Sequence, residues 1–457
     1  MKVKNSLIEG NIYIQLLKIS LPIIGTSFIQ MTYSLTDLFW IGKIGSGAVA
    51  AVGTAGFFIW LANAMTLTTN VGSQVTVSQS VGLKNYDKAK IYSLNSFKLV
   101  FLFSIILSFL IYLLAPSLMS FFDLGVDETG FNVTGASIDY LRIISFGLPF
   151  FLTNFTFTGI INGYGNTKIQ FYINAVGLLL NMILDPLLIL GIGFFPKLEV
   201  KGAALATSFS QIVVFIIFIL FIYKKETLFS LKRIFDPFSF EHIKSILKIG
   251  VPISLRNSLF AVFAMILAKI LTRWGAIPIA VQKIGAQVEA LSWRTASGVG
   301  LALSTFVGQN FGAGKYSRII SGYKKAIYII SILGVFVSLF FIFEGELLGK
   351  LFFSRSDVID AAAVYFRILG YSQMFMCLEI VTGGAFNGLG RTLPPSLVSI
   401  ILTGMRIPLA ILLSSIDYFG LNGVWWSISF TSVLKGIIVV IWFRHYLNKI
   451  KDKKIFV

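Results

Sequence analysis

The sequence contains few charged residues, one cysteine and two histidines. Asp, Glu, Lys and Arg make up 13% of its 457 residues, whereas soluble domains carry roughly 25%. The single cysteine, Cys377, excludes an internal disulfide bond. With only His242 and His445, and without a GxxxxGK[ST] motif, the chain gives no basis for a histidine-bound metal, a Ser-His triad or ATP-driven chemistry. We therefore expect a protein that is not an enzyme and needs no organic cofactor.

Long apolar runs take the place of the missing charge. Hydrophobic residues make up 56% of the chain, and its mean hydropathy is +0.83. A run of about 20 apolar residues forms a helix long enough to cross the hydrocarbon core of a bilayer. The sequence predicts an all-α polytopic membrane protein with twelve transmembrane helices, near residues 15–38, 48–80, 92–114, 138–162, 169–192, 202–223, 246–271, 278–305, 322–343, 364–388, 395–414 and 423–444. The first run has no A-x-A-like cleavage site close behind it, so we expect it to be retained.

The basic residues of the loops predict the orientation of these helices. With the N-terminus placed in the cytoplasm, 22 Lys and Arg residues fall in cytoplasmic loops and ends. Six fall on the other side: Lys43, Lys197, Lys201, Arg273, Lys350 and Arg355. Because Lys and Arg favour the cytoplasmic side, both termini are predicted to be cytoplasmic in a multi-pass protein of the cell membrane. The net charge of +18 then indicates contact with anionic membrane lipid rather than with nucleic acid.

The two halves of the chain resemble each other in polar residues as well as in apolar ones. The matching stretches are LKISLPI (17–23) with LKIGVPI (247–253), VSQSVGLKNY (77–86) with VGQNFGAGKY (307–316), and TGIINGYGNT (158–167) with GGAFNGLGRT (383–392). The first two pairs have an offset of 230 residues and the third an offset of 225. We interpret this as a duplication into two pseudo-symmetric six-helix lobes, 1–223 and 246–457, joined by a cytoplasmic linker, 224–245. Such bundles place a substrate site between their halves and alternate access to it.

Two acidic residues lie inside predicted spans of the first half. Asp37 is in the first span and Asp185 is in the fifth, where Asn181 precedes it by one helical turn on the same face. Asn154, in the fourth span, is a further polar neighbour in reach of hydrogen bonding. Because ionisable residues within a membrane are costly and usually functional, we expect these four residues to form a cation-coupling site.

The candidate site suits either of two ions. Carboxylate and amide oxygens, with a backbone carbonyl freed by Pro186, suit Na⁺. Burial and like-charge repulsion favour a protonated carboxyl group, so the same residues suit H⁺. The alternatives are a solvated helix end for Asp37 and a structural helix cap for Asp185. At the repeat-equivalent positions the chain has Leu267 and Ala410, so the two acids are not part of the duplicated scaffold.

The second half carries a different set of charges. Glu289 in the eighth span is expected either to face substrate or to pair with Arg406 of the eleventh, and Glu379 lies in the tenth. Structural ion pairs are the simpler interpretation of most of these residues. The residues predicted to line a substrate cavity are Glu289, Gln287, Met31 and Tyr33.

Five stretches together resemble the multidrug and toxic compound extrusion (MATE) family. They are LPIIGTSFIQMTYSLTDLFWIGKIG, VSQSVGLKNYDKAK, NGYGNTK, NMILDPLLILG and VGQNFGAGKY. Their order and spacing are similar to the family over nearly the whole chain. The resemblance implies twelve helices in two six-helix lobes, a central cavity, and export of amphipathic, mostly cationic organic compounds in exchange for Na⁺ or H⁺.

Within that family the sequence is more similar to the DinF-like pattern than to the NorM-like pattern. The DinF-like pattern places cation coupling in the N-terminal lobe, which here implies Asp37, Asn181 and Asp185, with Asn154 beside them. The NorM-like pattern has acids in its seventh and tenth helices. In this sequence the seventh span offers Arg256 in place of an acid.

Two other functions are compatible with a duplicated helical frame. A lipid-linked oligosaccharide flippase of the same superfamily would have a cationic cavity, for which Arg256, Lys283 and Arg294 are candidates. A receptor or scaffold would need a domain outside the membrane, and no segment between the predicted spans is long enough for one. An exporter of small organic cations, working as a monomer, is the function that the sequence favours.

Overall fold

The computed structural model describes residues 7–122, 125–126, 130–193, 195–225, 228–416 and 419–451. Helices contain most of these residues, and the β-bridge between Val126 and Asn132 is isolated. Lys2, Lys4, Lys453 and Lys454, which contribute to the predicted cytoplasmic charge, lie outside the described residues, as do residues 226–227 of the expected linker.

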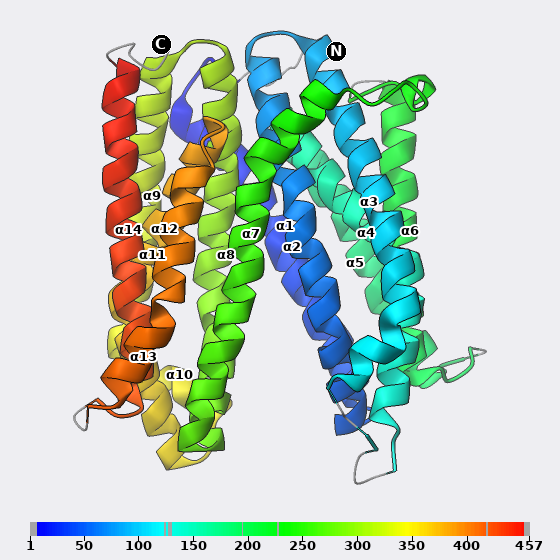
Figure 1. Cartoon of the computed structure of the whole chain (residues 1–457), viewed down its shortest axis with the longest axis vertical. Helices are drawn as coiled ribbons and strands as arrows, with labels where there is room; N and C mark the ends of the chain where they lie inside the picture. The colour runs from blue at the N-terminus through cyan, green and yellow to red at the C-terminus, as the bar shows by residue number, and fades with distance from the viewer. Residues whose placement is uncertain are drawn as a thin grey trace. The chain divides into compact units, whose positions relative to one another are not determined.

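Long helices follow one another with short connections (Figure 1). The helices of the first half are α1 (Ile12–Gly42), α2 (Ser46–Gly82), α3 (Tyr86–Ser120), α4 (Val133–Gly163), α5 (Thr167–Leu190) and α6 (Glu199–Lys225). Those that follow are η1 (Leu231–Arg233), α7 (Phe240–Leu271), η2 (Thr272–Trp274), α8 (Ala276–Gly312), α9 (Tyr316–Phe343), α10 (Gly345–Phe352), α11 (Ser356–Gly388), α12 (Leu393–Gly404), α13 (Arg406–Ser414) and α14 (Asn422–Lys451).

Eleven helical segments of the described chain are long and apolar enough to cross a membrane. They are α1 to α6, α7 with η2, α9, α11, α12 with α13, and α14. The remaining predicted span, α8, has 37 residues, and its hydropathy is reduced by Lys283, Glu289 and Arg294. The prediction of an all-α polytopic membrane protein is confirmed.

The structure differs from the predicted spans in two places. The predicted span 395–414 is divided between α12 and α13, which meet at Met405. Pro408 explains the division, because it has no N–H to donate to the carbonyl of Gly404 and its ring crowds that carbonyl. The second difference is α10, a helix of eight residues between α9 and α11 that is too short to have been recognised as a span.

The described residues form two compact units. The first comprises Gly25–Val251, in which α4 packs against α2, α3 and α6. The second comprises the described residues of Ser6–Ile24 and Pro252–Val457, in which α11 packs against α8, α9 and α14. Each unit thus includes the first part of a helix, α7 or α1, whose remainder belongs to the other unit. The lobe boundaries at residues 223 and 246 stay a prediction.

Glycines allow the same close helix contact in both units. Between α2 and α4, a Cβ atom on Gly159 would lie 2.3 Å from the carbonyl oxygen of Asn70. Between α8 and α11, a Cβ atom on Gly384 would lie 2.1 Å from the carbonyl oxygen of Gly300. A second contact of each kind follows one turn later, Gly163 on Gln74 and Gly388 on Ser304. These residues are related by the offsets of the sequence repeat, so the duplication extends to small-residue helix packing.

Replacement of Gly384 by alanine tests this packing. We expect Gly384→Ala to lower the apparent Tm of the detergent-purified protein, because overpacking a close contact costs about 1–3 kcal/mol. Gly383→Ala is the matched control, since a Cβ atom there meets nothing within 4 Å and alanine has the higher helix propensity. Thermal unfolding followed by fluorescence-detected size exclusion measures both variants. Equal Tm values would show that the close approach of α8 and α11 does not depend on this glycine.

Candidate ion-coupling site

Two helices of the first unit bring three of the predicted site residues together. Asp37 comes from α1, and Asn181 and Asp185 come from adjacent turns of α5. The amide Nδ2 of Asn181 donates to Oδ1 of Asp185 at 3.0 Å, and both side chains are fully buried. The carboxyl group of Asp37 lies within hydrogen-bonding reach of Asp185 and Asn181. Asp37 itself is half-buried, so its solvated-end interpretation and its role in ion coupling both stay predictions.

Oxygen atoms surround this trio. The hydroxyl of Thr207 in α6 lies within reach of Asp37 and of Tyr33, and the phenol of Tyr140 in α4 is close enough to interact with both aspartates. Thr207 and Tyr140 are absent from the sequence prediction. The signal for Thr207 was the polar stretch TSFSQ (207–211) inside an apolar run, whereas a tyrosine near a helix end gives none. Tyr33, predicted for the substrate cavity, belongs to this oxygen cluster.

Several of these oxygens lack a hydrogen bond of regular geometry. Among the described residues, the buried oxygens without one include Tyr33 OH, Asp37 Oδ1, Asn181 Oδ1, Asp185 Oδ2 and Thr207 Oγ1. Buried polar atoms are rarely left in this way unless water or an ion completes the site. An all-oxygen group of carboxylate, amide and hydroxyl donors is the set that hard cations prefer.

No basic side chain balances the two aspartates. Among the described residues, neither Asp37 nor Asp185 forms an ion pair within 4.0 Å, and the groups that act on them are acidic or neutral. Two carboxylates have no hydrogen to share, so a hydrogen bond between them requires a proton. The site therefore has two ways to be satisfied, by a shared proton or by a small cation.

Asn154 is held by a different partner. Its Nδ2 donates to the backbone oxygen of Gln211 at 2.8 Å and to the side-chain Oε1 of Gln211 at 3.1 Å. The Oδ1 atom of Asn154 is buried and has no hydrogen bond of its own in the described chain. These contacts tie α4 to α6, and a direct role of Asn154 in ion coupling stays a prediction.

The corresponding positions of the second unit are apolar. Leu267 of α7 and Ala410 of α13 are buried in one hydrophobic cluster with Ile270, Leu271 and Val424. The duplicated frame thus brings the equivalent helices together in both units, but it surrounds the contact with oxygen atoms in one and with hydrocarbon in the other. The two acids are therefore not required by the packing that the two units have in common.

Glu289 of α8 is held by a hydrogen-bond network with α11. Its Oε1 accepts from the hydroxyl of Tyr365 at 2.6 Å and its Oε2 accepts from Nε2 of Gln373 at 3.3 Å. Ser292, one turn further along α8, donates to Oε1 of Gln373 at 3.0 Å. Both oxygens of Glu289 are therefore engaged, although its predicted contact with substrate stays a prediction.

The predicted pair of Glu289 with Arg406 is not formed. Arg406 is buried and donates to Thr431 at 3.0 Å and to Ser432 at 2.8 Å, both in α14. Its charge still acts on Glu289 through space. Glu289 and Arg406 are thus each hydrogen-bonded to neutral partners. The packing of α13 on α14 places Arg406 beside the hydroxyl groups of α14 rather than beside Glu289.

Glu379 and Lys435 form a buried ion pair between α11 and α14. Their oxygen and nitrogen atoms, Oε2 and Nζ, lie 3.0 Å apart, and the side chains are only 11% and 6% exposed. Ser399 donates to the other oxygen of Glu379 at 3.0 Å, and Arg256 acts on it electrostatically. Lys435 was not identified from the sequence, because it lies near the middle of an otherwise apolar span.

Two further residues predicted for the substrate cavity have different exposure. Met31 of α1 is partly exposed, and Gln287 of α8 is exposed. Among the described residues, no group of three His, Cys, Asp or Glu side chains is placed to hold a metal ion. Any metal bound at the aspartates would therefore depend on neutral oxygens as well as on the two carboxyl groups.

A sequence model of the MatE family matches residues 22–187 and 252–412. The two matches begin 230 residues apart, which is the offset of the internal repeat. Two curated relatives align over most of their length. The protein named "Probable multidrug resistance protein NorM" from Thermotoga maritima is 28% identical over 90% of this chain and 88% of its own. A protein named "FAD transporter" from Shewanella oneidensis is 26% identical over 96% of this chain and 95% of its own.

Solved structures have the same fold. A crystal structure of MATE in complex with MaD5 superposes with a TM-score of 0.87 at 23% sequence identity, covering 98% of each chain. This confirms the predicted two-lobe, twelve-helix architecture. The similarities do not separate the DinF-like from the NorM-like branch, so that assignment stays a prediction.

The Glu379–Lys435 pair can be tested by a double-mutant cycle. We expect Glu379→Gln and Lys435→Met each to lower the apparent Tm strongly, because an unpartnered buried charge costs about 3–5 kcal/mol. The double variant removes both charges and should recover much of the loss. Thermal unfolding of the purified protein measures the cycle. Additive losses in the double variant would contradict a direct pair.

Proposed function

Since the chain belongs to the MatE family, we propose that it is a cation-coupled antiporter that exports amphipathic, mostly cationic organic compounds by alternating access. The observation that carries this proposal is the pair of carboxyl groups of Asp37, which is half-buried, and Asp185, which is buried. They have neutral oxygens around them and no basic partner within 4.0 Å in the described chain. The name of the Thermotoga maritima relative supports drug export as the class of activity. A transporter of this kind is not an enzyme.

The coupling step follows from the needs of the two carboxyl groups. When a proton or Na⁺ binds, it removes the repulsion between Asp37 and Asp185 and engages oxygens that otherwise lack partners. Its binding therefore favours whichever conformation holds these oxygens closest together. An exported compound that favours the other conformation is then released as the ion binds, which is the condition for exchange.

The membrane supplies enough energy for such an exchange. One positive charge that moves inward releases about 2.3 kcal/mol per 100 mV of membrane potential. A tenfold ion gradient adds about 1.4 kcal/mol. Together these support an outward gradient of several hundredfold for a neutral compound exchanged against one ion. Export of a monovalent cation for one monovalent ion cancels the electrical part.

A specific observation favours a second candidate, the export of an anionic compound. In the second unit, three basic residues lie in the helix bundle: Arg406 and Lys435 are buried, and Arg256 is partly buried. The acidic residues that act on them are two, Glu289 and Glu379. The relative named "FAD transporter" aligns over nearly the whole chain. Competition of ethidium efflux by a flavin nucleotide distinguishes this candidate from a cation exporter.

The alternatives have less support. The names of the relatives described above do not favour a lipid-linked oligosaccharide flippase. A flippase would have a cationic cavity, and Lys283, a candidate for lining it, is exposed rather than enclosed. A scaffold would leave the unpaired aspartates without a role.

Neutralising either aspartate is the main test. We expect Asp37→Asn and Asp185→Asn to reduce ion-driven ethidium efflux from proteoliposomes by about tenfold or more, because each variant removes a negative charge that attracts the ion and that the ion neutralises. The matched control is Asp139→Asn, an exposed residue of α4 that pairs with Lys201 at 2.9 Å. Wild-type efflux by both site variants would contradict the proposal.

Imposed gradients identify the coupling ion. Vesicles that carry a Na⁺ gradient at equal pH, and vesicles that carry a pH gradient without Na⁺, are compared for wild type and for Asp37→Asn. We expect one of the two gradients to drive efflux by the wild type and neither to drive it in the variant. Efflux that needs neither gradient would show that the oxygens around Asp37 do not couple an ion.

A further inference from the structure

The second unit contains a polar cluster within its membrane-spanning helices that the proposed ion coupling does not use. Three basic side chains belong to it, Arg256 of α7, Arg406 of α13 and Lys435 of α14. The acids that act on them are Glu289 and Glu379. Three positive and two negative charges leave one positive charge in excess. Because charge within a membrane is costly and usually functional, this surplus points to a ligand.

The acids of this cluster already have other partners. Glu379 pairs with Lys435, with 3.0 Å between Oε2 and Nζ. Glu289 accepts hydrogen bonds from the neutral side chains of Tyr365 and Gln373. In the described chain, neither acid lies within 4.0 Å of a guanidinium nitrogen of the cluster. The two arginines therefore have no carboxylate of their own.

The two guanidinium groups keep N–H donors that no described residue accepts. Arg406 donates through Nε to Thr431 at 3.0 Å and through Nη2 to Ser432 at 2.8 Å. A guanidinium has five N–H donors, so these two hydroxyls leave most of them unused. Arg256 is half-buried and is attracted by Glu379 through space. It forms neither an ion pair within 4.0 Å nor a hydrogen bond with a described residue.

Helix α7 packs against the end of α12, where the cluster lies. A Cβ atom on Gly404 would lie 3.3 Å from the ring of Phe263, which follows Arg256 by two turns on one face of α7. Thr403 precedes Arg406 by about one turn. The side chain of Thr403 is buried, and its Oγ1 has no hydrogen bond in the described chain. A hydroxyl donor is thus added beside the start of α13.

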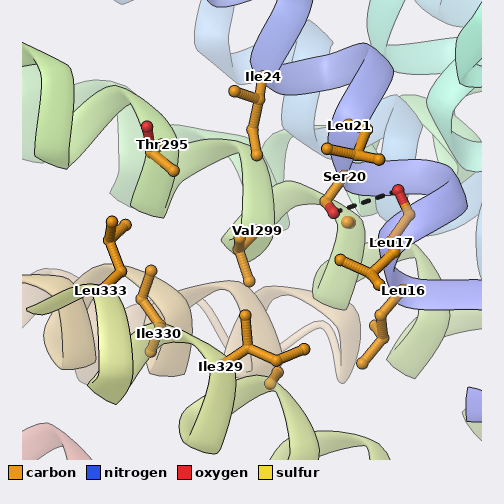
Figure 2. Close-up of a pocket in the computed structure, with 12 residues that line it drawn as sticks. Leu16, Leu17, Ser20, Leu21, Ile24, Thr295, Val299, Ile329, Ile330 and Leu333 are labelled. Carbon is orange, nitrogen blue, oxygen red and sulfur yellow. Dashed lines mark hydrogen bonds between the residues drawn. The ribbon is translucent and has the colours of Figure 1, made fainter. Parts of the chain in front are cut away.

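The apolar pocket of the same unit offers no such donors. It has a volume of about 200 Å³ and lies between α1, α8 and α9. Figure 2 shows Leu21, Val299 and Ile330 facing this space. Its hydroxyls donate to carbonyls of their own helices, at 3.4 Å for Ser20 and 2.7 Å for Thr295. An anionic group therefore finds its partners in the polar cluster and not in this pocket.

From this arrangement we infer a binding site in the second unit for the carboxylate or phosphate group of an amphipathic compound, formed by Arg256 and Arg406. A guanidinium binds either group through two parallel N–H bonds. One negative charge on the bound compound equals the positive surplus of the cluster. The inference develops the anionic candidate of the proposed function, and it rests on that function for the export of the bound compound.

Two flavins test the charge requirement on the full-length protein in detergent. Riboflavin and riboflavin 5′-phosphate have the same fluorescent ring system and differ by one phosphate group. Equilibrium dialysis with fluorescence detection measures the binding of each. We expect the wild type to bind the phosphate at least about tenfold more tightly, because only the phosphate engages the guanidinium groups. Equal affinity for the two flavins, or no measurable binding of the phosphate, would overturn the inference.

Substitution of Arg256 separates a binding role from a structural one. We expect Arg256→Gln to weaken binding of riboflavin 5′-phosphate about tenfold and to leave riboflavin binding unchanged. Arg256→Lys should keep part of the preference for the phosphate, because it keeps the charge and loses the two-bond geometry. Arg273→Gln removes an exposed arginine just beyond α7 and is the control. An unchanged preference in Arg256→Gln would overturn the inference.

Ethidium efflux keeps this test separate from that of the proposed function. If the wild type exports ethidium in exchange for an ion but binds both flavins alike, the anion site is refuted and the exporter stands. If Asp37→Asn exports ethidium like the wild type while the phosphate preference is present, the proposed coupling is refuted and the anion site stands.

Discussion

The structure depends on two carboxyl groups that share one membrane-embedded site and have no basic partner among the described residues. Charges in a hydrocarbon environment persist only when they are paired or when they serve a function. Glu379 meets the first condition, since Lys435 lies 3.0 Å away. Asp37 and Asp185 do not, because the groups around them in the described chain are hydroxyl, amide and carboxyl groups. This is the arrangement on which the proposed binding of a small positive ion rests.

Duplication provided the frame in which this difference arose. The same glycines bring α2 against α4 and α8 against α11, with equivalent residues at each close approach. At the positions of Asp37 and Asp185, however, the second unit has Leu267 and Ala410 inside a hydrophobic cluster. Packing constraints preserve the backbone geometry of both units, whereas the side chains at this one contact are free to differ. Among the described residues, the acids of the proposed ion site have apolar residues at the equivalent positions of the second unit.

The second unit uses its polar groups to hold helices together. Glu289 joins α8 to α11 through Tyr365 and Gln373, and Arg406 joins α13 to α14 through hydroxyl groups. Because buried polar groups without partners are costly, these bonds fix the rotation of each helix relative to its neighbours. The first part of α1 belongs to this unit as well. Helix α1 therefore contributes residues to both units, among them Asp37 to the first.

The sequence by itself determined the features that depend on local spacing. Apolar runs of sufficient length predicted the spans, eleven of which are long and apolar enough in the described chain, and the repeat offsets predicted two related units. The placement of Asn181 one turn before Asp185 followed from helix periodicity, and their hydrogen bond confirms it. These conclusions hold because residues three or four apart on a helix are neighbours in every context.

Only the tertiary structure decided which helices bring their polar groups together. Asp37 of α1 reaches Asp185 of α5, and Thr207 and Tyr140 lie beside them. Glu379 pairs with Lys435, whereas Arg406 bonds to hydroxyl groups and not to Glu289. These contacts depend on helix rotation and depth. Those quantities are set by close contacts between distant segments, such as Gly159 on Asn70. Hydropathy records that a residue lies in the membrane, but the partner it meets there is chosen by packing.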